Sequence, residues 1–279
     1  MQPSPAVFDL FAVPAHGVPV GGGQGHSVHA GDLVLSPGRD SATAGWLNPL
    51  LARLAAELDH ERPRSVRIAM PIPARDLRWV VQGWGASRFE PGTRPCRDLD
   101  VLLATGRLLH ARLAAALPGR PPALGQRQDR WARAERLAFE TDPSAGRAVP
   151  DAGGQAPGTP LPAGTPPAVR ALVTELAAEC DGTDLGPDQL VHGDLAGNVL
   201  LDATGLPLVI DVAPYWRPVL WAEAVCVLDA VRWWGADRRA VHAWATGAPR
   251  QAMVRAAIFR VLSDPGCDVA AYRRLLQPS

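Results

Sequence analysis

The sequence contains no lysine, so all 28 of its basic residues are arginine. They are matched by 28 acidic residues, which gives a formal net charge of zero at pH 7. A chain without excess positive charge has no overall attraction to nucleic acid or to an anionic membrane surface. We therefore expect neither as a partner.

Long apolar runs and clustered cysteines are also missing. The longest apolar stretch, near residues 218–231, is interrupted by Glu223 and Asp229 and is too short to cross a bilayer. The first residues lack the basic region and the long apolar core of a signal peptide. The four cysteines are widely spaced, which favours buried thiols over zinc ligands or disulfides. These features predict a soluble, cytoplasmic protein.

The pattern of apolar residues changes along the chain. Residues 1–95 read mostly as short strands with one helix over 43–58, and residues 96–279 read mostly as helices. The expected strands are 8–13, 18–20, 33–35, 66–72 and 79–84. The expected later helices are 99–113, 127–139, 169–180, 220–231, 236–245, 250–262 and 269–276. Residues 141–168 are rich in proline and glycine and are expected to form a flexible insertion. The fold class predicted is α+β, with a small strand-rich N-lobe and a larger helical C-lobe.

One stretch, residues 190–216, concentrates polar residues of the kind found in active sites. A short strand end is followed by a loop with His192, Asp194 and Asn198, then by a hairpin over 199–210, and then by Asp211. Turn-forming residues between the two halves of the hairpin support this interpretation. The hairpin would bring Asp211 back beside Asn198.

This combination suits phosphoryl transfer. An aspartate can orient the acceptor hydroxyl and take its proton, while an asparagine four residues later and a second aspartate hold magnesium at the ATP phosphates. Each residue alone could simply form a turn or end a strand. The combination is much rarer than its parts, so we favour the chemical interpretation.

The segment HGDLAGNVL followed by VID resembles the catalytic loop and metal-binding segment of the aminoglycoside phosphotransferase and choline kinase superfamily, which shares the protein-kinase-like fold. The continuation, VAPYWRP and WAEAVCVLDAVRWWGA, resembles a set of actinobacterial conserved hypothetical proteins within it. The resemblance implies a two-lobed kinase-like fold. It also implies that Asp194 is the catalytic base, that Asn198 and Asp211 are magnesium ligands, and that His192 braces the loop.

The same resemblance suggests a nucleotide site in the N-lobe. Glycines between two expected strands would let backbone amides approach the ATP phosphates, although a flexible turn of this composition is at least as common. The residues are Gly21, Gly22, Gly23 and Gly25, with the hydroxyl of Ser27 nearby. Ala86 and Ser87 are the candidates for pairing with adenine through the backbone.

The lysine that kinase-like folds use to hold the phosphates is missing. By the resemblance its position falls on Ser36, and its usual glutamate partner is also lacking, because the helix over 43–58 carries only Glu57 near its end. If this protein does not use the lysine–glutamate ion pair, we expect both residues to be lost together, since a single charge left buried is costly. Arg39, Arg53 or an arginine from elsewhere in the chain could replace the lysine, although a guanidinium is bulkier than an ammonium.

Tyr215, Trp216 and Arg217 are expected to form a rigid turn that borders the acceptor pocket. Arg217 would either pair with Glu223 or Asp229, which is the commoner fate of an arginine, or face an anionic substrate.

The sequence thus predicts an ATP- and Mg²⁺-dependent phosphotransferase that acts on a hydroxyl of a small molecule. The main alternative is a pseudokinase, which keeps the fold without phosphoryl transfer because Ser36 replaces the lysine. A third possibility is transfer of AMP by an inverted nucleotide, which arginines converging near the glycine-rich segment would indicate.

Overall fold

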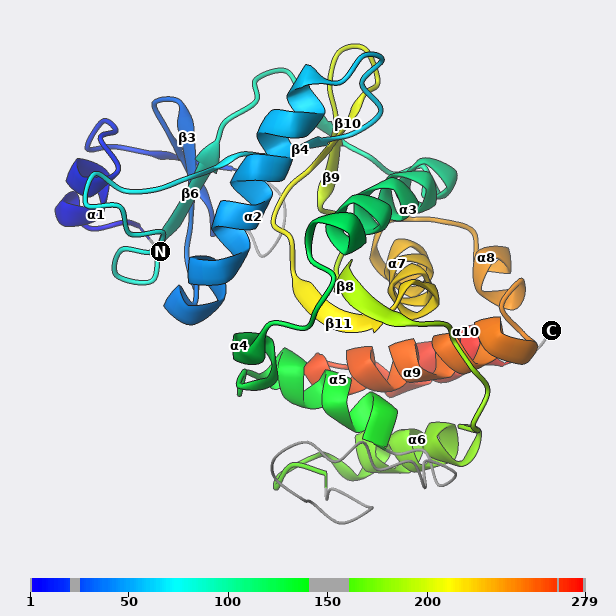
Figure 1. The fold of residues 1–279 in the computed structure, drawn as a ribbon. Helices are drawn as coiled ribbons and strands as arrows, with labels where there is room; N and C mark the ends of the chain where they lie inside the picture. Colours follow the sequence, from blue (N-terminus) through cyan, green and yellow to red (C-terminus); the bar gives the residue numbers. More distant parts are fainter. Residues whose placement is uncertain (1, 21–25, 141–160, 265, 278–279) are drawn as a thin grey trace.

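The computed structural model describes residues 2–20, 26–140, 161–264 and 266–277. Figure 1 shows a strand-rich part formed by the first third of the chain beside a larger, mainly helical part. The α+β class predicted from the sequence is therefore confirmed.

An antiparallel five-stranded sheet forms the N-terminal part. Its strands follow the order β1-β2-β3-β6-β5. Their bounds are β1 Val18–Pro19, β2 Val28–Ala30, β3 Leu33–Ser36, β6 Gly85–Arg88 and β5 Pro71–Ile72. Helix α2 (Ser41–His60) begins at Asp40, whose carboxylate accepts a 2.7 Å hydrogen bond from the Thr43 amide. This bond satisfies one of the amides left free at a helix start.

Two expected strands of this part are wrong. Residues 8–13 lie mostly in helix α1 (Pro5–Leu10) and the turn after it, and proline at the first helical position favours that start. Residues 79–84 form a turn, in which Gln82 and Gly83 have φ angles of 50° and 79°. Only an isolated bridge joins Val81 to Trp84.

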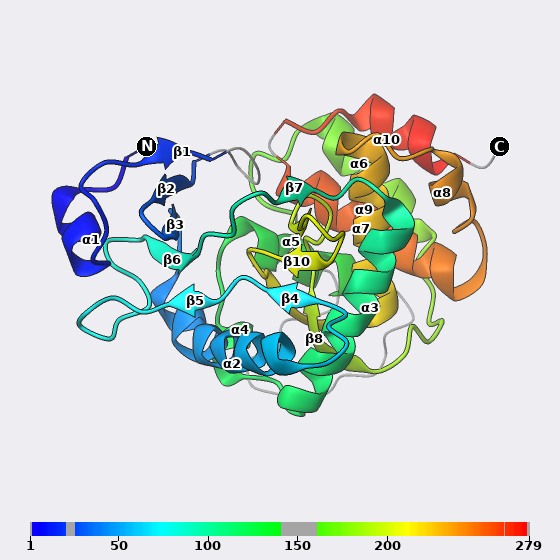
Figure 2. The same ribbon diagram turned by 90° about the horizontal axis from the view of Figure 1, so that it is seen from above.

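The expected strand over residues 66–72 is divided between two sheets. β4 (Arg67–Ile68) pairs with β10 in a four-stranded sheet of order β4-β10-β9-β7, whereas β5 belongs to the N-terminal sheet. Figure 2 shows β5 and β4 following one another along α2. This chain segment therefore connects the N-terminal sheet to the hairpin of the second sheet.

The predicted hairpin forms, with β9 at Val199–Leu201 and β10 at Pro207–Val209, and β7 (Arg94–Pro95) pairs with β9. A two-stranded ribbon lies beside it, made of β8 (Asp188–His192) and β11 (Pro214–Pro218). Residues 214–218 are thus a strand and not the rigid turn that was expected. Their two prolines stand at the ends of a two-stranded ribbon, where proline is tolerated.

Helix α9 is the centre of the helical part. It packs against α5, α6 and α7, and its residues from Gln251 to Val261 are all buried. The helices are α3 Leu99–Ala116, α4 Pro122–Gly125, α5 Arg130–Glu140, α6 Pro167–Ala178, α7 Val219–Trp233, α8 Arg239–His242, α9 Gly247–Ser263 and α10 Val269–Leu276. Among the described residues, no helix has the length and apolar character needed to cross a membrane.

Candidate active site

The end of β8 and the loop that follows it carry three of the predicted site residues, His192, Asp194 and Asn198. β8 ends at His192, which pairs with Pro214 of β11, and the hairpin begins directly after Asn198. The carbonyl of Asn198 accepts a 2.9 Å hydrogen bond from the amide of Ile210, so the next residue, Asp211, is held beside the loop. The structure therefore brings together the loop and Asp211 as the sequence predicted.

Two glycines of this loop allow close packing. A Cβ atom added to Gly193 would lie 2.4 Å from the ring of Tyr215, and one added to Gly197 would lie 2.3 Å from the ring of Trp234. Gly197 also has a φ of 89°, which side chains other than glycine rarely adopt. The loop around Asp194 is consequently fixed between two aromatic rings.

Two buried histidines brace the loop from inside. Nδ1 of His192 accepts hydrogen bonds from the amides of Asp194 (3.2 Å) and Ala213 (3.3 Å). The amide of His192 in turn donates to Nε2 of His110, on α3, at 3.1 Å. Burial lowers the pKa of His192, and it lowers the pKa of His110 to about 3, so both rings are neutral acceptors at pH 7.

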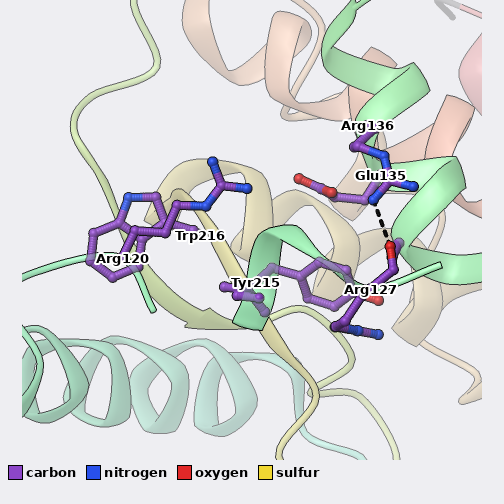
Figure 3. Close-up of a pocket in the computed structure, with 8 residues that line it drawn as sticks. Arg120, Arg127, Glu135, Arg136, Tyr215 and Trp216 are labelled. Atoms are coloured by element: carbon purple, nitrogen blue, oxygen red, sulfur yellow. Dashed lines mark hydrogen bonds between the residues drawn. The ribbon is translucent and has the colours of Figure 1, made fainter. Parts of the chain in front are cut away.

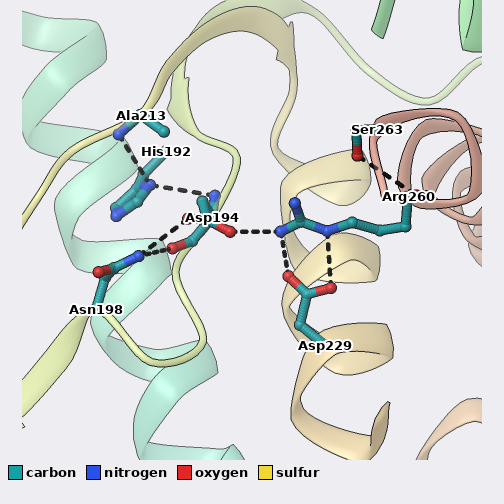
Figure 4. Close-up of polar contacts among 7 residues, drawn as sticks. All are labelled: His192, Asp194, Asn198, Ala213, Asp229, Arg260 and Ser263. Carbon is teal, nitrogen blue, oxygen red and sulfur yellow. Dashed lines mark hydrogen bonds and ion pairs between the residues drawn. The ribbon is translucent and has the colours of Figure 1, made fainter. Parts of the chain in front are cut away.

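Asp194 is held by a buried arginine from α9. Its Oδ1 accepts a 2.6 Å hydrogen bond from Nη2 of Arg260, whose Nε and Nη2 also bind the carboxylate of Asp229 on α7 (Figure 4). Arg260 and Asp229 are 7% and 2% exposed, whereas the Asp194 side chain is 46% exposed. Burial opposes the charge of Arg260, but its carboxylate partners raise the pKa of the guanidinium, so it stays protonated. Asp194 is thus fixed on one side and open on the other.

Asn198 also holds Asp194, through hydrogen bonds from its side-chain amide. Its Nδ2 donates to the backbone carbonyl of Asp194 at 2.6 Å and to Oδ2 at 3.1 Å (Figure 4). The opposite atom, Oδ1, is buried and has no hydrogen-bond partner among the described residues. A buried acceptor without a partner is unfavourable, so this oxygen is available for a ligand.

Asp211 is paired with an arginine from the N-terminal part. Its Oδ1 accepts a hydrogen bond from Arg39, in the segment between β3 and α2. Partial burial favours the neutral acid, but the charge and hydrogen bond of Arg39 outweigh it and lower the pKa of Asp211. The backbone of Asp211 has a φ of 48°, a conformation uncommon outside glycine that often marks functional positions.

The oxygens of Asn198 and Asp211 are the atoms that could hold a magnesium ion. Among the described residues, no group of three or more histidines, cysteines, aspartates and glutamates is arranged to hold a metal. Magnesium in nucleotide sites is commonly bound by one or two protein oxygens together with substrate phosphates and water. The unpartnered Oδ1 of Asn198 fits such a site.

The expected nucleotide residues are only partly described. Gly21, Gly22, Gly23 and Gly25 lie outside the described residues. The structure does bring together Ser27 and Ser36, whose hydroxyl oxygens are 3.0 Å apart.

Ala86 and Ser87 do not have free backbone groups for adenine. They lie in β6, which pairs on one side with β3 and on the other with β5. The expectation that their backbone pairs with a base is therefore wrong, because the sheet already uses those groups.

The structure separates the two arginines that could replace the lysine. Arg53 pairs with Glu57 on the exposed face of α2, where both side chains are more than half exposed. Arg39 instead reaches Asp211. The two acidic residues of α2, Glu57 and Asp59, pair with Arg53 and Arg67, so neither pairs with Arg39.

Tyr215, Trp216 and Arg217 are placed on β11. Tyr215 is buried against Gly193, and Trp216 lines a small pocket with it. Arg217 pairs with Glu135 and stacks 4.0 Å from the ring centroid of Phe139. The expectation that Arg217 pairs with Glu223 or Asp229 is therefore wrong.

Glu223 instead pairs with Arg107, and Asp229 pairs with Arg260.

Sequence reasoning missed three residues around Asp194. Nothing in the sequence pattern assigned His110 or Arg260 to the site, and Asp229 was expected only as a possible partner of Arg217. A charged residue inside an apolar run, as in AAIFRVL and VCVLDAV, was the available signal. It could show that each charge needs a partner, but not that the partners meet at Asp194.

No protein-family model matches the chain, and a search of curated proteins gives no match. Several solved structures are similar. A choline/ethanolamine kinase family protein from Mesorhizobium loti is 17% identical, with 97% of this chain and 91% of the other covered and a TM-score of 0.42. Choline kinase from Streptococcus pneumoniae is 12% identical, with 97% and 96% covered and a TM-score of 0.45.

A macrolide 2'-phosphotransferase from Brachybacterium faecium is 17% identical, with 91% and 87% covered and a TM-score of 0.40. At such low identities and TM-scores, function has to be argued from the residues of this chain.

Proposed function

We propose that this protein transfers the terminal phosphoryl group of ATP to a hydroxyl of a small molecule. The observation that carries the proposal is the difference between the two polar atoms of the Asn198 side chain. Its amide nitrogen donates to Asp194, while its amide oxygen is buried and has no hydrogen-bond partner among the described residues. An asparagine that served only the loop would have no need of an unsatisfied buried oxygen.

Asp194 would accept the hydrogen bond of the acceptor hydroxyl on its exposed side. The contacts from Arg260 and Asn198 fix the direction of its carboxylate. Phosphoryl transfer proceeds through a loose transition state that depends mainly on positioning and charge neutralisation. A rigidly oriented carboxylate suits this requirement.

Asn198 Oδ1 and Asp211 would hold Mg²⁺. When bound, the ion neutralises negative charge on the nucleotide phosphates. Arg39, which lies on Asp211 in the structure, would then be released to donate to the same phosphates. Its planar fork matches phosphate oxygens well and would supply the charge that Ser36 cannot.

The Arg39–Asp211 pair also favours the second candidate, a pseudokinase. If the pair persists when nucleotide is present, a guanidinium occupies the carboxylate that the metal needs. The protein could then bind nucleotide without transferring phosphate.

The test is product formation from ATP labelled at either the γ- or the α-phosphate, with Mg²⁺ and a panel of hydroxyl compounds. We expect γ-label on an acceptor, and a loss of about 10²–10⁴-fold in Asp194→Asn. Glu57→Gln, in the surface pair on α2, is the control and should leave the rate unchanged. Transfer of the α-label would identify an AMP transferase. Nucleotide binding without transfer of either label to any acceptor would favour the pseudokinase.

A further inference from the structure

A small pocket next to the catalytic loop is lined by arginine. It lies between α4, α5 and β11, and its polar lining comprises Arg120, Arg127, Arg136 and Glu135 together with Tyr215 and Trp216. Figure 3 shows Arg120 beside Trp216 at one side and Arg127, Glu135 and Arg136 at the other, with Tyr215 between them.

The only carboxylate in the lining is already used. Glu135 pairs with Arg217 on β11. Arg127 binds Asp129 through two hydrogen bonds of 2.9 and 3.2 Å, so its charge is balanced as well. The pocket therefore has no free carboxylate to attract a cation.

Two guanidinium groups of the pocket remain without a carboxylate among the described residues. Arg136 donates to the backbone carbonyl of Arg127 at 2.9 Å, and the exposed Arg120 reaches over Gly125. Asp188, an exposed residue at the start of β8, interacts with Arg120 and Arg217 at longer range. The pocket thus keeps an excess of positive charge among its guanidinium donors.

The pocket is one aromatic ring away from Asp194. The ring of Tyr215 packs on Gly193, the residue before Asp194, and the guanidinium carbon of Arg127 lies 5.3 Å from the centroid of that ring. Arg127 also donates to the carbonyl of Pro214 at 2.8 Å, which fixes the pocket wall to β11. An acceptor with a hydroxyl at Asp194 could therefore place a second group among the arginines.

We infer that this pocket binds an anionic group of the acceptor, so the substrate is an acidic hydroxyl compound and not a polycation. The inference rests on the proposed phosphotransferase function. Guanidinium groups bind phosphate and carboxylate by paired, charge-assisted hydrogen bonds. An ammonium group placed there would meet like charge and would leave these donors without an acceptor.

Direct binding of simple anions is the first test. Methyl phosphate, inorganic sulfate and acetate are titrated into the whole protein, and binding is followed by calorimetry. We expect at least about tenfold weaker binding in Arg136→Gln and in the double variant with Arg120→Gln, because one charge-assisted hydrogen bond contributes about that factor. Arg133→Gln is the matched control, since Arg133 is exposed on the same helix and outside the pocket lining.

The relative strength of methyl phosphate and acetate distinguishes a phosphorylated from a carboxylated acceptor. Equal binding of all three anions to wild type and to the double variant would overturn the inference. Arg120→Gln alone, at an exposed position, keeps the test valid if the change at Arg136 impairs folding.

The second test compares acceptors. Hydroxy acids and sugar phosphates should be phosphorylated in preference to amino alcohols and aminoglycosides, and Arg136→Gln should raise KM for them at least about tenfold with little change in kcat. Transfer to cationic acceptors alone would refute the anion pocket while leaving the phosphotransferase intact. Anion binding at the arginines without transfer to any acceptor would refute the phosphotransferase and retain the pocket.

Discussion

The two aspartates of the candidate site are held by arginines in very different ways. Asp211 pairs with Arg39, and the two side chains are 41% and 33% exposed. Asp194 is held by Arg260, which is 7% exposed and anchored by the nearly inaccessible Asp229. Solvent screens the first pair, so it can open at small cost, whereas breaking the second would leave a charge buried.

This difference suits two tasks. A carboxylate that orients an acceptor hydroxyl has to stay in one place, and Arg260 keeps Asp194 there. A carboxylate that receives a metal ion has to exchange partners, and the exposed pair of Arg39 and Asp211 permits the exchange. The comparison predicts large effects on stability from the buried arginine and small ones from the exposed arginine.

The largest effect is expected from Arg260→Gln. It removes the cation that two carboxylates share and leaves Asp229 buried without a partner, which should cost about 3–5 kcal/mol of unfolding free energy. Chemical denaturation measures it. The double variant Arg260→Met, Asp229→Leu should lose much less, because a well-packed apolar pair avoids the unpaired charge. Arg273→Gln, in an exposed pair with Glu175, should cost at most about 1 kcal/mol. A similar small loss for Arg260→Gln would show that Asp194 is not held as described.

The next effect concerns the packing of the loop. Gly193→Ala would place a methyl group against the ring of Tyr215, and overpacking of this kind costs about 1–3 kcal/mol. The control is Gly45→Ala in α2, where nothing lies within 4 Å and helix propensity should instead add about 0.5–1 kcal/mol. Equal stability of the two variants would contradict the tight fit of the loop.

Acidification should lower the unfolding free energy through the buried His110. Burial keeps the folded pKa of His110 at about 3, whereas an unfolded histidine binds a proton below about pH 6.5. The unfolded state therefore takes up protons first, and unfolding free energy falls as pH decreases from about 6.5 toward 3. His110→Phe should reduce that slope by up to about 1.4 kcal/mol per pH unit, as measured by denaturation between pH 4.5 and 7. A wild-type slope in His110→Phe would refute the assignment.

The smallest effect on stability is expected from Arg39→Gln. An exposed ion pair contributes at most about 1 kcal/mol, and salt screens it further. Denaturation at low and high salt measures the loss, which should shrink as salt increases. A loss of several kcal/mol that is independent of salt would mean that this pair is as rigid as the buried one.

The polar loop and its hairpin could be predicted because their signals are local. Turn residues between two strand-forming runs set the hairpin, and its return places Asp211 beside Asn198. Short apolar runs were less informative. The apolar pattern of segment 8–13 fits a helix or a strand equally well, and the proline that favours the start of α1 lies before that segment, at position 5.

The partners of Asp194 could not be predicted from the sequence. Arg260 lies 66 residues after Asp194, and nothing in the sequence distinguishes it from the other arginines of α9; only the packing of α9 against α7 places it between Asp194 and Asp229. The same limit applies to Arg217, whose partner Glu135 is on α5. Ion-pair partners that are distant in sequence depend on how the helices pack, and local sequence patterns do not predict that packing.

The most direct test of the account is the melting temperature with ATP, with and without Mg²⁺, for wild type, Asp211→Asn and Arg39→Gln. A ligand that binds only the folded protein at 100 times its Kd adds about 2.7 kcal/mol. We predict a Mg²⁺-dependent increase in wild type that is lost in Asp211→Asn and reduced in Arg39→Gln. An increase that does not need Mg²⁺ and persists in Asp211→Asn, or no increase at millimolar ATP, would contradict the exchange of Arg39 for a metal-bound nucleotide.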